Sequence, residues 1–322
     1  MKNIFCLICL LSLIACKKET PDYKPSFSVV EVDTLLTDSI SIRAIAVDDD
    51  RLWYAGSNGK YGYVSADGKG KSFAGVIARD TVLPEFRAIA KTSSSVFILN
   101  AGTPATLYKI SKDGRRNEMV YTEKGDKVFY DSMQFFDDKN GIAMGDPTEN
   151  CLSVIITDNG GQTWKKIPCN NLPQAAKGEA AFAASNSNII VRGSHAWIVS
   201  GGMKSRVFHS ADKGLSWEVF DTPIVQGTAM SGIFSADFYD ENIGFAVGGN
   251  YEKRNDNHKN KIITTDGGHS WEVVADGAAF GYASCVQFIP KSKGNELVTV
   301  GPAGVYYSYD RGANWKKILD SS

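Results

Sequence analysis

The sequence predicts an all-β fold, a six-bladed β-propeller with four strands in each blade. The pattern Ser/Thr-x-Asp/Asn-x-Gly-x-x-Trp occurs four times, beginning at Thr157, Ser210, Thr264 and Ser308. Around it the same order of apolar segments recurs every 44 to 53 residues, a period typical of propeller blades. A further strand-like segment, Phe27 to Leu35, pairs with the last blade and closes the ring in this interpretation. In the alternative it is the remnant of a seventh blade.

The repeated pattern has the chemistry of a stapled β-turn. An Asp or Asn side chain accepts hydrogen bonds from backbone N–H groups of its own turn, and the Gly takes a positive φ. The Trp begins the next strand and buries a large ring. The pattern resembles the Asp box of BNR-repeat propellers, which include sialidases and sortilin-like receptors. We therefore expect structural roles, without chemistry, for Asp67, Asn159, Asp212, Asp266, Asp310, Trp164, Trp217, Trp271 and Trp315.

Each predicted unit consists of four strands. The innermost strand opens near residues 43, 87, 131, 179, 232 and 283, and the second strand ends in Gly. The third strand runs into the Asp-containing turn, and the fourth begins at its Trp. A degenerate turn at Ser65 carries Asp67 but has Phe73 in place of Trp. After Cys16 no long stretch holds a clear helical period, so we expect very little helix.

The N-terminal residues predict export and lipidation. Residues 1–15 combine a basic start with an apolar run of secretory length, typical of a signal peptide. Leu13 to Cys16 resembles the lipobox of bacterial lipoproteins, which implies cleavage before Cys16 and its lipidation. Residues 16–26 are a polar tether and residues 27–322 a single propeller domain. No Asp follows Cys16, which favours the outer membrane; which side of it the protein faces is left open.

The charge balance excludes a nucleic-acid partner from the expected functions. Without residues 1–15 the chain keeps 34 Lys and Arg against 36 Asp and Glu. No basic excess is then available to neutralise phosphates. We expect a monomer.

Cysteine use suggests one disulfide. Cys151 and Cys169 flank a predicted hairpin turn near residue 160, so a cross-strand bridge is one interpretation in an oxidising compartment. Two unlinked buried side chains are the other. Cys285 would be an unpaired core thiol.

No motif for a metal or a cofactor is visible. The four histidines, His195, His209, His258 and His269, show no spacing typical of a zinc site. The sequence also lacks a nucleophile elbow, a P-loop and a dinucleotide-binding glycine motif. We therefore expect neither a metal nor a cofactor.

Candidate functional residues lie on the propeller face opposite the Asp-containing turns. The strand starts place Arg43, Arg87, Asp131, Glu179 and Tyr282 near one rim of the central channel. A rim with arginines, carboxylates and a tyrosine is similar to that of sialidases, although charged rims also occur in propellers that catalyse nothing. If the protein were a glycosidase, Asp131 and Glu179 would face each other at roughly 5–9.5 Å. A long polar loop near residues 250–260 lies on the same face.

Beyond the turns, most of residues 43–318 is similar to secreted bacterial propellers described as photosystem II stability/assembly factor-like. The similarity rests on stretches such as Gly141 to Pro147, Gly178 to Asn186 and Gly301 to Gly304. It implies a propeller that lives outside the cytoplasm and binds a protein client. We therefore predict a membrane-anchored, non-catalytic propeller that binds a protein or glycan partner. The alternative is a sialidase-like glycoside hydrolase.

Overall fold

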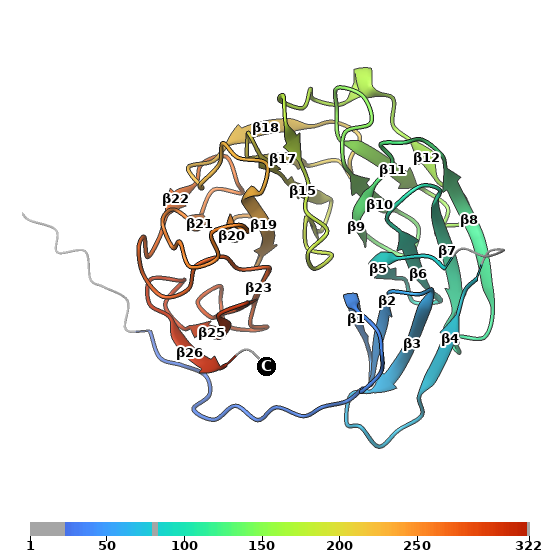
Figure 1. Cartoon of the computed structure of the whole chain (residues 1–322), viewed down its shortest axis with the longest axis horizontal. Helices are drawn as coiled ribbons and strands as arrows, with labels where there is room; N and C mark the ends of the chain where they lie inside the picture. Colours follow the sequence, from blue (N-terminus) through green and yellow to red (C-terminus); the bar gives the residue numbers. More distant parts are fainter. Residues whose placement is uncertain (1–22, 79–82, 321–322) are drawn as a thin grey trace, which may run out of the picture.

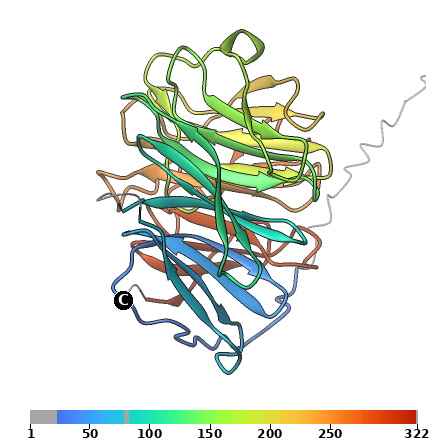
Figure 2. The same cartoon turned by 90° about the vertical axis from the view of Figure 1, so that its right-hand side faces the viewer.

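The chain forms six sheets of antiparallel strands arranged in a ring (Figure 1). The structure is a computed structural model that describes residues 23–78 and 83–320. Figure 2 shows the same ring from the side, with the sheets stacked one after another. The predicted six-bladed β-propeller is confirmed, and the seven-bladed alternative is not formed. Within the described ranges, no helix is long and apolar enough to cross a membrane.

Each blade contributes four strands in chain order. Blade 1 holds β1 (Ile42–Asp48), β2 (Arg51–Gly56), β3 (Lys60–Ser65) and β4 (Phe73–Val76). Blade 2 holds β5 (Phe86–Lys91), β6 (Ser95–Asn100), β7 (Ala105–Ser111) and β8 (Asn117–Glu123). Blade 3 holds β9 (Tyr130–Phe135), β10 (Gly141–Gly145), β11 (Ser153–Thr157) and β12 (Lys165–Lys166). Blade 4 holds β14 (Ile189–Arg192), β15 (His195–Val199), β17 (Arg206–Ser210) and β18 (Glu218–Asp221). Blade 5 holds β19 (Ser231–Phe238), β20 (Gly244–Asn250), β21 (Lys261–Thr264) and β22 (Glu272–Val273). Blade 6 holds β23 (Cys285–Phe288), β24 (Leu297–Gly301), β25 (Gly304–Ser308) and β26 (Lys316–Leu319).

The Ser/Thr–Asp/Asn–Gly–Trp turns share one set of hydrogen bonds. In blade 4, Asp212 Oδ1 accepts hydrogen bonds from the backbone N–H of Leu215 at 3.0 Å and of Ser216 at 2.8 Å. The Ser210 hydroxyl donates to Asp212 at 2.8 Å and accepts from the Gly214 N–H at 2.8 Å. Equivalent bonds surround Asn159, Asp266 and Asp310. The acidic or amide side chain therefore satisfies backbone donors that the turn would leave without partners.

The same turns also attach blades 3 to 6 to the blade that precedes each of them. Gly214 of blade 4 has a φ of 87°, and a Cβ there would lie 3.0 Å from Ile142 of blade 3. Gly268 of blade 5 packs in the same way against Trp197 of blade 4. The Trp of each turn lies in the hydrophobic cluster shared with the preceding blade. Glycine is required here by both the positive φ and the close approach.

The boundary between blade 6 and blade 1, called here the seam, is packed differently. The five hydrophobic clusters of the described residues each join two successive blades, from blades 1 and 2 to blades 5 and 6. None of them joins blade 6 to blade 1. On the strands beside the seam, Ile45 is 55% exposed, Val47 63% and Val300 43%.

Residues 23–41 connect the two sides of the seam (Figure 1). Near its start, the Ser26 hydroxyl donates to Glu296 of blade 6 at 2.7 Å, and Phe27 packs on Tyr307 at 4.5 Å between ring centroids. Near its end, Lys60 of blade 1 forms an ion pair of 2.8 Å with Asp38. The predicted strand over residues 27–35 is wrong, because this segment has no strand and its valines face solvent rather than a sheet.

The start of blade 4 also differs from the prediction. Residue 179 was expected to open its innermost strand, but that strand is β14, which begins ten residues later at Ile189. Glu179 belongs instead to β13 (Glu179–Ala180), which pairs with β16 (Gly201–Gly202) beside the innermost strand of blade 5. The β-branched run at Ile189 to Val191 is the true inner strand, because it has the apolar side chains that two neighbouring blades bury.

Residues 181–188, called here the central loop, form hydrogen bonds to several blades of the ring. Asn186 donates from Nδ2 to the Ile89 carbonyl of blade 2 at 2.8 Å and accepts from the Met133 N–H of blade 3 at 3.1 Å. Ser187 shares a hydrogen bond of 2.7 Å with Ser235 of blade 5. Ser185 donates to the Ser284 carbonyl just before β23 at 2.8 Å. The central loop thus connects blades 2 and 3 with blade 5 and the start of blade 6.

A disulfide lies at the edge of blade 3. Cys151 and Cys169 are bonded, with their Cα atoms 5.7 Å apart. Cys169 begins the 3₁₀ helix η1 (Cys169–Asn171). The bridge therefore fixes the start of the long connection that leads to the central loop. Cys285 is a free, partly buried cysteine.

We predict that the turns need a hydrogen-bond acceptor at the Asp position rather than a charge. Asp212→Ala removes the acceptor and should lower the free energy of unfolding by about 1–3 kcal/mol. Asp212→Asn keeps Oδ1, as Asn159 does in blade 3, and should cost less than about 0.5 kcal/mol. Urea denaturation measures both, with Asp126→Ala in an exposed loop as the control. Equal losses in the Ala and Asn variants would show that the charge matters instead.

Candidate functional site

The mouth of the central channel opposite the turns is the candidate site. Three of the five rim residues predicted from sequence, Arg43, Arg87 and Asp131, start the innermost strands β1, β5 and β9. Their charges influence one another, since both Arg43 and Asp131 affect the pKa of Arg87. Tyr282 precedes β23; burial, and next the neighbouring Tyr251, raise its pKa, and the charges of Arg254 and Arg43 oppose this rise. These residues are therefore near enough for their charges to interact at the channel mouth, whereas Glu179 pairs with Arg206 of blade 4.

The two arginines form a pair of like charges. The Arg87 guanidinium donates a hydrogen bond of 3.3 Å to the Ala183 carbonyl in the central loop. Burial, and next the positive charge of Arg43, lower the pKa of Arg87. Across residues 23–78 and 83–320, neither arginine forms an ion pair with a carboxylate. The charges of Glu85 and Asp131 oppose the lowering of the Arg87 pKa, but two guanidinium groups without an ion-pair partner in these ranges still suit an anionic ligand.

Asp131 is completely buried and feels the charge of Arg87. Its side chain has 0% exposure, and neither carboxylate oxygen has a hydrogen-bond partner among the described residues. Burial, followed by the charge of Asp146, raises the pKa of Asp131 well above its ordinary value, and Arg87 opposes this rise. Asp146 accepts a hydrogen bond of 2.8 Å from the Ala181 N–H, and burial raises its pKa too. Two buried carboxyl groups thus lie close enough for the charge of one to affect the other.

Glu179 is held by a different set of partners. Its carboxylate accepts two hydrogen bonds from Arg206, at 3.0 and 2.5 Å, and one from the Ser200 hydroxyl at 2.6 Å. The backbone N–H of Ala176 donates a fourth at 2.7 Å. With its side chain fully buried, Glu179 is a structural ion pair that secures β13. The structure therefore does not present Glu179 and Asp131 to a substrate as two accessible carboxyl groups.

An aromatic and basic cluster borders the mouth at blade 5. Tyr251 packs edge-on against Tyr282 with 5.3 Å between ring centroids, and the Arg254 guanidinium lies 4.3 Å from the centre of the Tyr251 ring. The Arg254 carbonyl accepts a hydrogen bond of 2.9 Å from the Tyr282 N–H. The polar loop expected near residues 250–260 is thus fixed to the segment before β23, and it adds a third arginine to this face.

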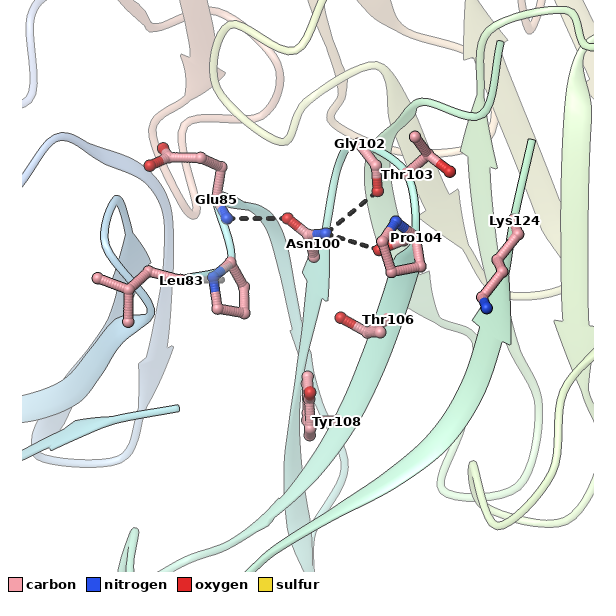
Figure 3. Close-up of a pocket in the computed structure, with 10 residues that line it drawn as sticks. Leu83, Glu85, Asn100, Gly102, Thr103, Pro104, Thr106, Tyr108 and Lys124 are labelled. Atoms are coloured by element: carbon pink, nitrogen blue, oxygen red, sulfur yellow. Dashed lines mark hydrogen bonds between the residues drawn. The ribbon is translucent and has the colours of Figure 1, made fainter. Parts of the chain in front are cut away.

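A cavity of about 460 Å³ opens on the same face, between the segment before β5 and the β6–β7 loop (Figure 3). Asn100 organises it, because its side chain accepts from the Glu85 N–H at 2.8 Å and donates to the Pro104 carbonyl at 2.8 Å. The Thr103–Pro104 peptide bond in its wall is cis. The lining is mostly apolar or neutral and consists of Leu83, Pro84, Glu85, Asn100, Gly102, Thr103, Pro104, Thr106, Tyr108 and Lys124. An apolar side chain of a ligand would fit there.

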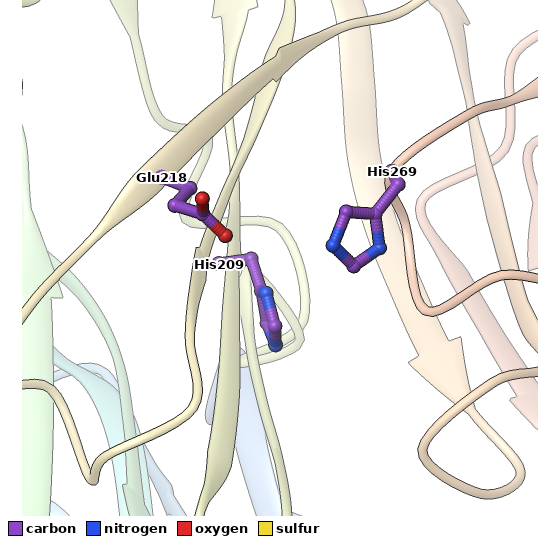
Figure 4. Close-up of side chains that lie close together, drawn as sticks. All are labelled: His209, Glu218 and His269. Atoms are coloured by element: carbon purple, nitrogen blue, oxygen red, sulfur yellow. The ribbon is translucent and has the colours of Figure 1, made fainter.

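Sequence reasoning missed one group of residues, which lies on the turn face. His209 and Glu218 are cross-strand partners in β17 and β18, and His269 lies in the turn of blade 5 (Figure 4). One potential ligand atom from each lies within 4.8 Å of the others. Burial, and then the neighbouring imidazoles, lower the pKa of His209 to about 4. No sequence spacing indicates this cluster, because strand pairing and blade packing create it.

We predict that Asp131→Asn stabilises the protein, and more so at alkaline than at acidic pH. Because the pKa of Asp131 is raised in the folded state, its stabilising protonated form is present below about pH 4 and is lost as pH rises. An Asn side chain does not ionise, so the variant loses no stability from deprotonation as pH rises. Its free energy of unfolding should therefore exceed that of the unaltered protein by about 1–3 kcal/mol at pH 8 and by less at pH 5. Urea denaturation at both pH values, with Asp126→Asn as the control, measures this. A variant that is less stable at pH 8 would show that attraction between Asp131 and Arg87 outweighs the cost of burial.

Comparisons with known proteins bear on the fold. No protein-family model matches the sequence, and no curated protein matches it either. Among solved structures, YCF48 bound to D1 peptide is similar with a TM-score of 0.59 and 13% identity, covering 86% of this chain and 82% of that one. The structure of U3-55K has a TM-score of 0.60 and 13% identity over 89% and 83% of the two chains. The RRP9 WD40 repeats have a TM-score of 0.59 and 11% identity over 89% and 82%. At these identities the similarity establishes the propeller fold alone.

Proposed function

We propose that this protein is a non-catalytic propeller that binds an acidic, extended segment of a partner protein across the channel mouth. The observation that carries the proposal is the pair Arg43 and Arg87, which has no carboxylate partner in the described residues. Arginine binds carboxylates through parallel charge-assisted hydrogen bonds, which are stronger than neutral ones. A peptide carboxylate would therefore give these arginines a direct ion-pair partner, which Glu85 and Asp131 provide only at longer range.

The neighbouring cavity gives such a peptide a second contact. Glu85 lines the cavity and stands two residues before Arg87 in the chain, so a bound segment would reach both sites with adjacent residues. An apolar side chain in the cavity and a carboxylate at the arginines would together fix the direction of the peptide. Such buried anchors carry most of the binding energy in protein interfaces.

The comparisons are consistent with this proposal. YCF48, a propeller of similar fold, has a structure with a D1 peptide bound. The hydrogen bonds of the four turns support their assignment as Asp boxes of the BNR type. The lipid anchor at Cys16 and the location at the outer membrane remain part of the proposal, and Cys16 lies outside the described residues.

A sialidase-like hydrolase and a neutral glycan partner receive less support. Glycosidases of the common mechanisms need two carboxyl groups that flank the substrate. Asp131 and Glu179 are both buried, and Glu179 is already bonded to Arg206. The arginine pair favours an anionic ligand over a neutral one.

We predict that Arg43→Ala combined with Arg87→Ala weakens binding of an acidic peptide. The probes are two sets of fluorescently labelled peptides of about ten residues. The acidic set contains Asp and Glu, and the neutral set has Asn and Gln at the same positions. The unaltered protein should bind the acidic set more tightly, and the double variant should lose about 10–100-fold in affinity. Added salt should weaken the same binding. Fluorescence anisotropy measures each affinity.

The matched control is Arg115→Ala combined with Arg116→Ala. These two exposed arginines lie in the turn of blade 2, on the opposite face of the ring. Their loss should leave the affinity unchanged. Equal weakening by both double variants, or equal binding of acidic and neutral peptides, would refute the proposed site.

A further inference from the structure

The turn of blade 5 places one histidine over another from blade 4. Trp197 in β15 donates from Nε1 to the Gly267 carbonyl at 2.7 Å, which seats the blade 5 turn on blade 4. His209 is the cross-strand partner of Trp197, and Glu218 is the cross-strand partner of His209. Cross-strand partners project from the same side of a sheet. His209 and Glu218 therefore face the turn that carries His269, as Figure 4 shows.

One nitrogen of His209 is left without a hydrogen-bond partner. The side chain is buried, with 6% exposure, and its Nδ1 has no hydrogen bond in the described residues. Its other nitrogen, Nε2, lies 2.9 Å from Nδ1 of His195. A buried polar atom without a partner costs free energy, so an unfilled site of this kind calls for a ligand. The lone pair of an imidazole nitrogen binds metal ions well.

In His209 and His269, the ring nitrogen that would not bind the metal lies in a hydrogen bond, as is usual for histidines that bind metal ions. Histidines that bind a metal usually donate their second N–H to a carbonyl, a carboxylate or a similar acceptor. His269 Nδ1 lies 2.6 Å from the Asp266 carbonyl, which leaves Nε2 free as a ligand atom. His209 Nε2–H can donate to His195, whose own Nε2 lies 3.8 Å from Glu241. Both imidazoles thus have their orientation fixed by a hydrogen bond.

We propose that His209, Glu218 and His269 bind a divalent transition-metal ion, zinc in the first instance, and thereby link blade 4 to blade 5 on the turn face. Two imidazoles and one carboxylate form a ligand set that suits zinc and related ions, whereas Mg²⁺ and Ca²⁺ prefer sites made only of oxygen. The fourth position of a tetrahedral ion would be taken by water.

The geometry needs only a small adjustment. Ligand atoms 2.0–2.1 Å from a tetrahedral zinc ion lie about 3.3 Å apart. The atoms here lie within 4.8 Å of one another, and Glu218 and His269 are exposed. Rotation of the exposed Glu218 side chain, with a small shift of His269 that keeps its hydrogen bond to Asp266, can therefore bring the ligand atoms toward His209.

Metal binding to the purified chain tests the proposal. After treatment with EDTA, the chain is titrated with ZnCl₂, with MgCl₂ as the comparison, and followed by calorimetry and thermal melting. We expect one zinc ion per chain, no effect of magnesium, and a rise in melting temperature of about 4 °C at a free zinc concentration of about one hundred times Kd. Cobalt should give the visible absorption of a four-coordinate ion.

The variants remove only exposed ligands, so that the buried His209 and its packing stay intact. Glu218→Gln combined with His269→Ala should weaken zinc binding by more than about 100-fold and abolish the cobalt spectrum. The matched control is His258→Ala, because this histidine lies in the β20–β21 loop next to Asp276 and should not matter. Absence of zinc binding, zinc binding that survives the double variant, or zinc binding lost in His258→Ala or Cys285→Ser would overturn the proposal.

Discussion

The ring depends on the attachment of each blade's turn to the blade before it. In blades 3 to 6 the turn glycine lies directly against a large side chain of the preceding blade's second strand, as Gly268 lies against Trp197. The Trp of the same turn fills the cluster between the two sheets. The Asp or Asn side chain keeps the turn in the required shape. A single short segment therefore sets the local backbone and the contact between neighbouring sheets at the same time, which explains why it recurs.

The absence of such a turn contact between blade 1 and blade 6 explains the seam. Blade 1 carries a degenerate turn, with an extra residue and Phe73 where blades 3 to 6 have Trp, and the blade before it in the ring is blade 6. Phe73 packs within the cluster of blades 1 and 2, so no turn reaches back to blade 6. Two other devices span the ring instead. The first is the segment 23–41, which packs on Tyr307 of blade 6 near its start and pairs with Lys60 of blade 1 near its end. The second is the central loop, which forms hydrogen bonds to blades 2, 3 and 5 and to Ser284.

The repeat predicted the fold because the turn is a local structure. Positions such as Asp212 and Trp217 are defined by contacts within eight residues, and these appear directly in the sequence. The rim residues Arg43, Arg87 and Asp131 followed from the blade alignment. Glu179 did not, because the insertion before blade 4 displaces the strand start to Ile189. The contacts between His209, Glu218 and His269 depend on strand register and on how one blade docks onto the next. Residues separated by such distances in the chain leave no periodic signal.

The seam has a mechanical consequence. Bending the ring at any of the five packed boundaries separates buried apolar side chains, which costs free energy in proportion to the area exposed. At the seam the side chains of Ile45 and Val300 already face water, so a small displacement there exposes little new surface. The most compliant point of the ring thus adjoins the strand that carries Arg43. At the channel mouth, the distance between Arg43 and the groups contributed by blades 5 and 6 can therefore change at the lowest cost in free energy.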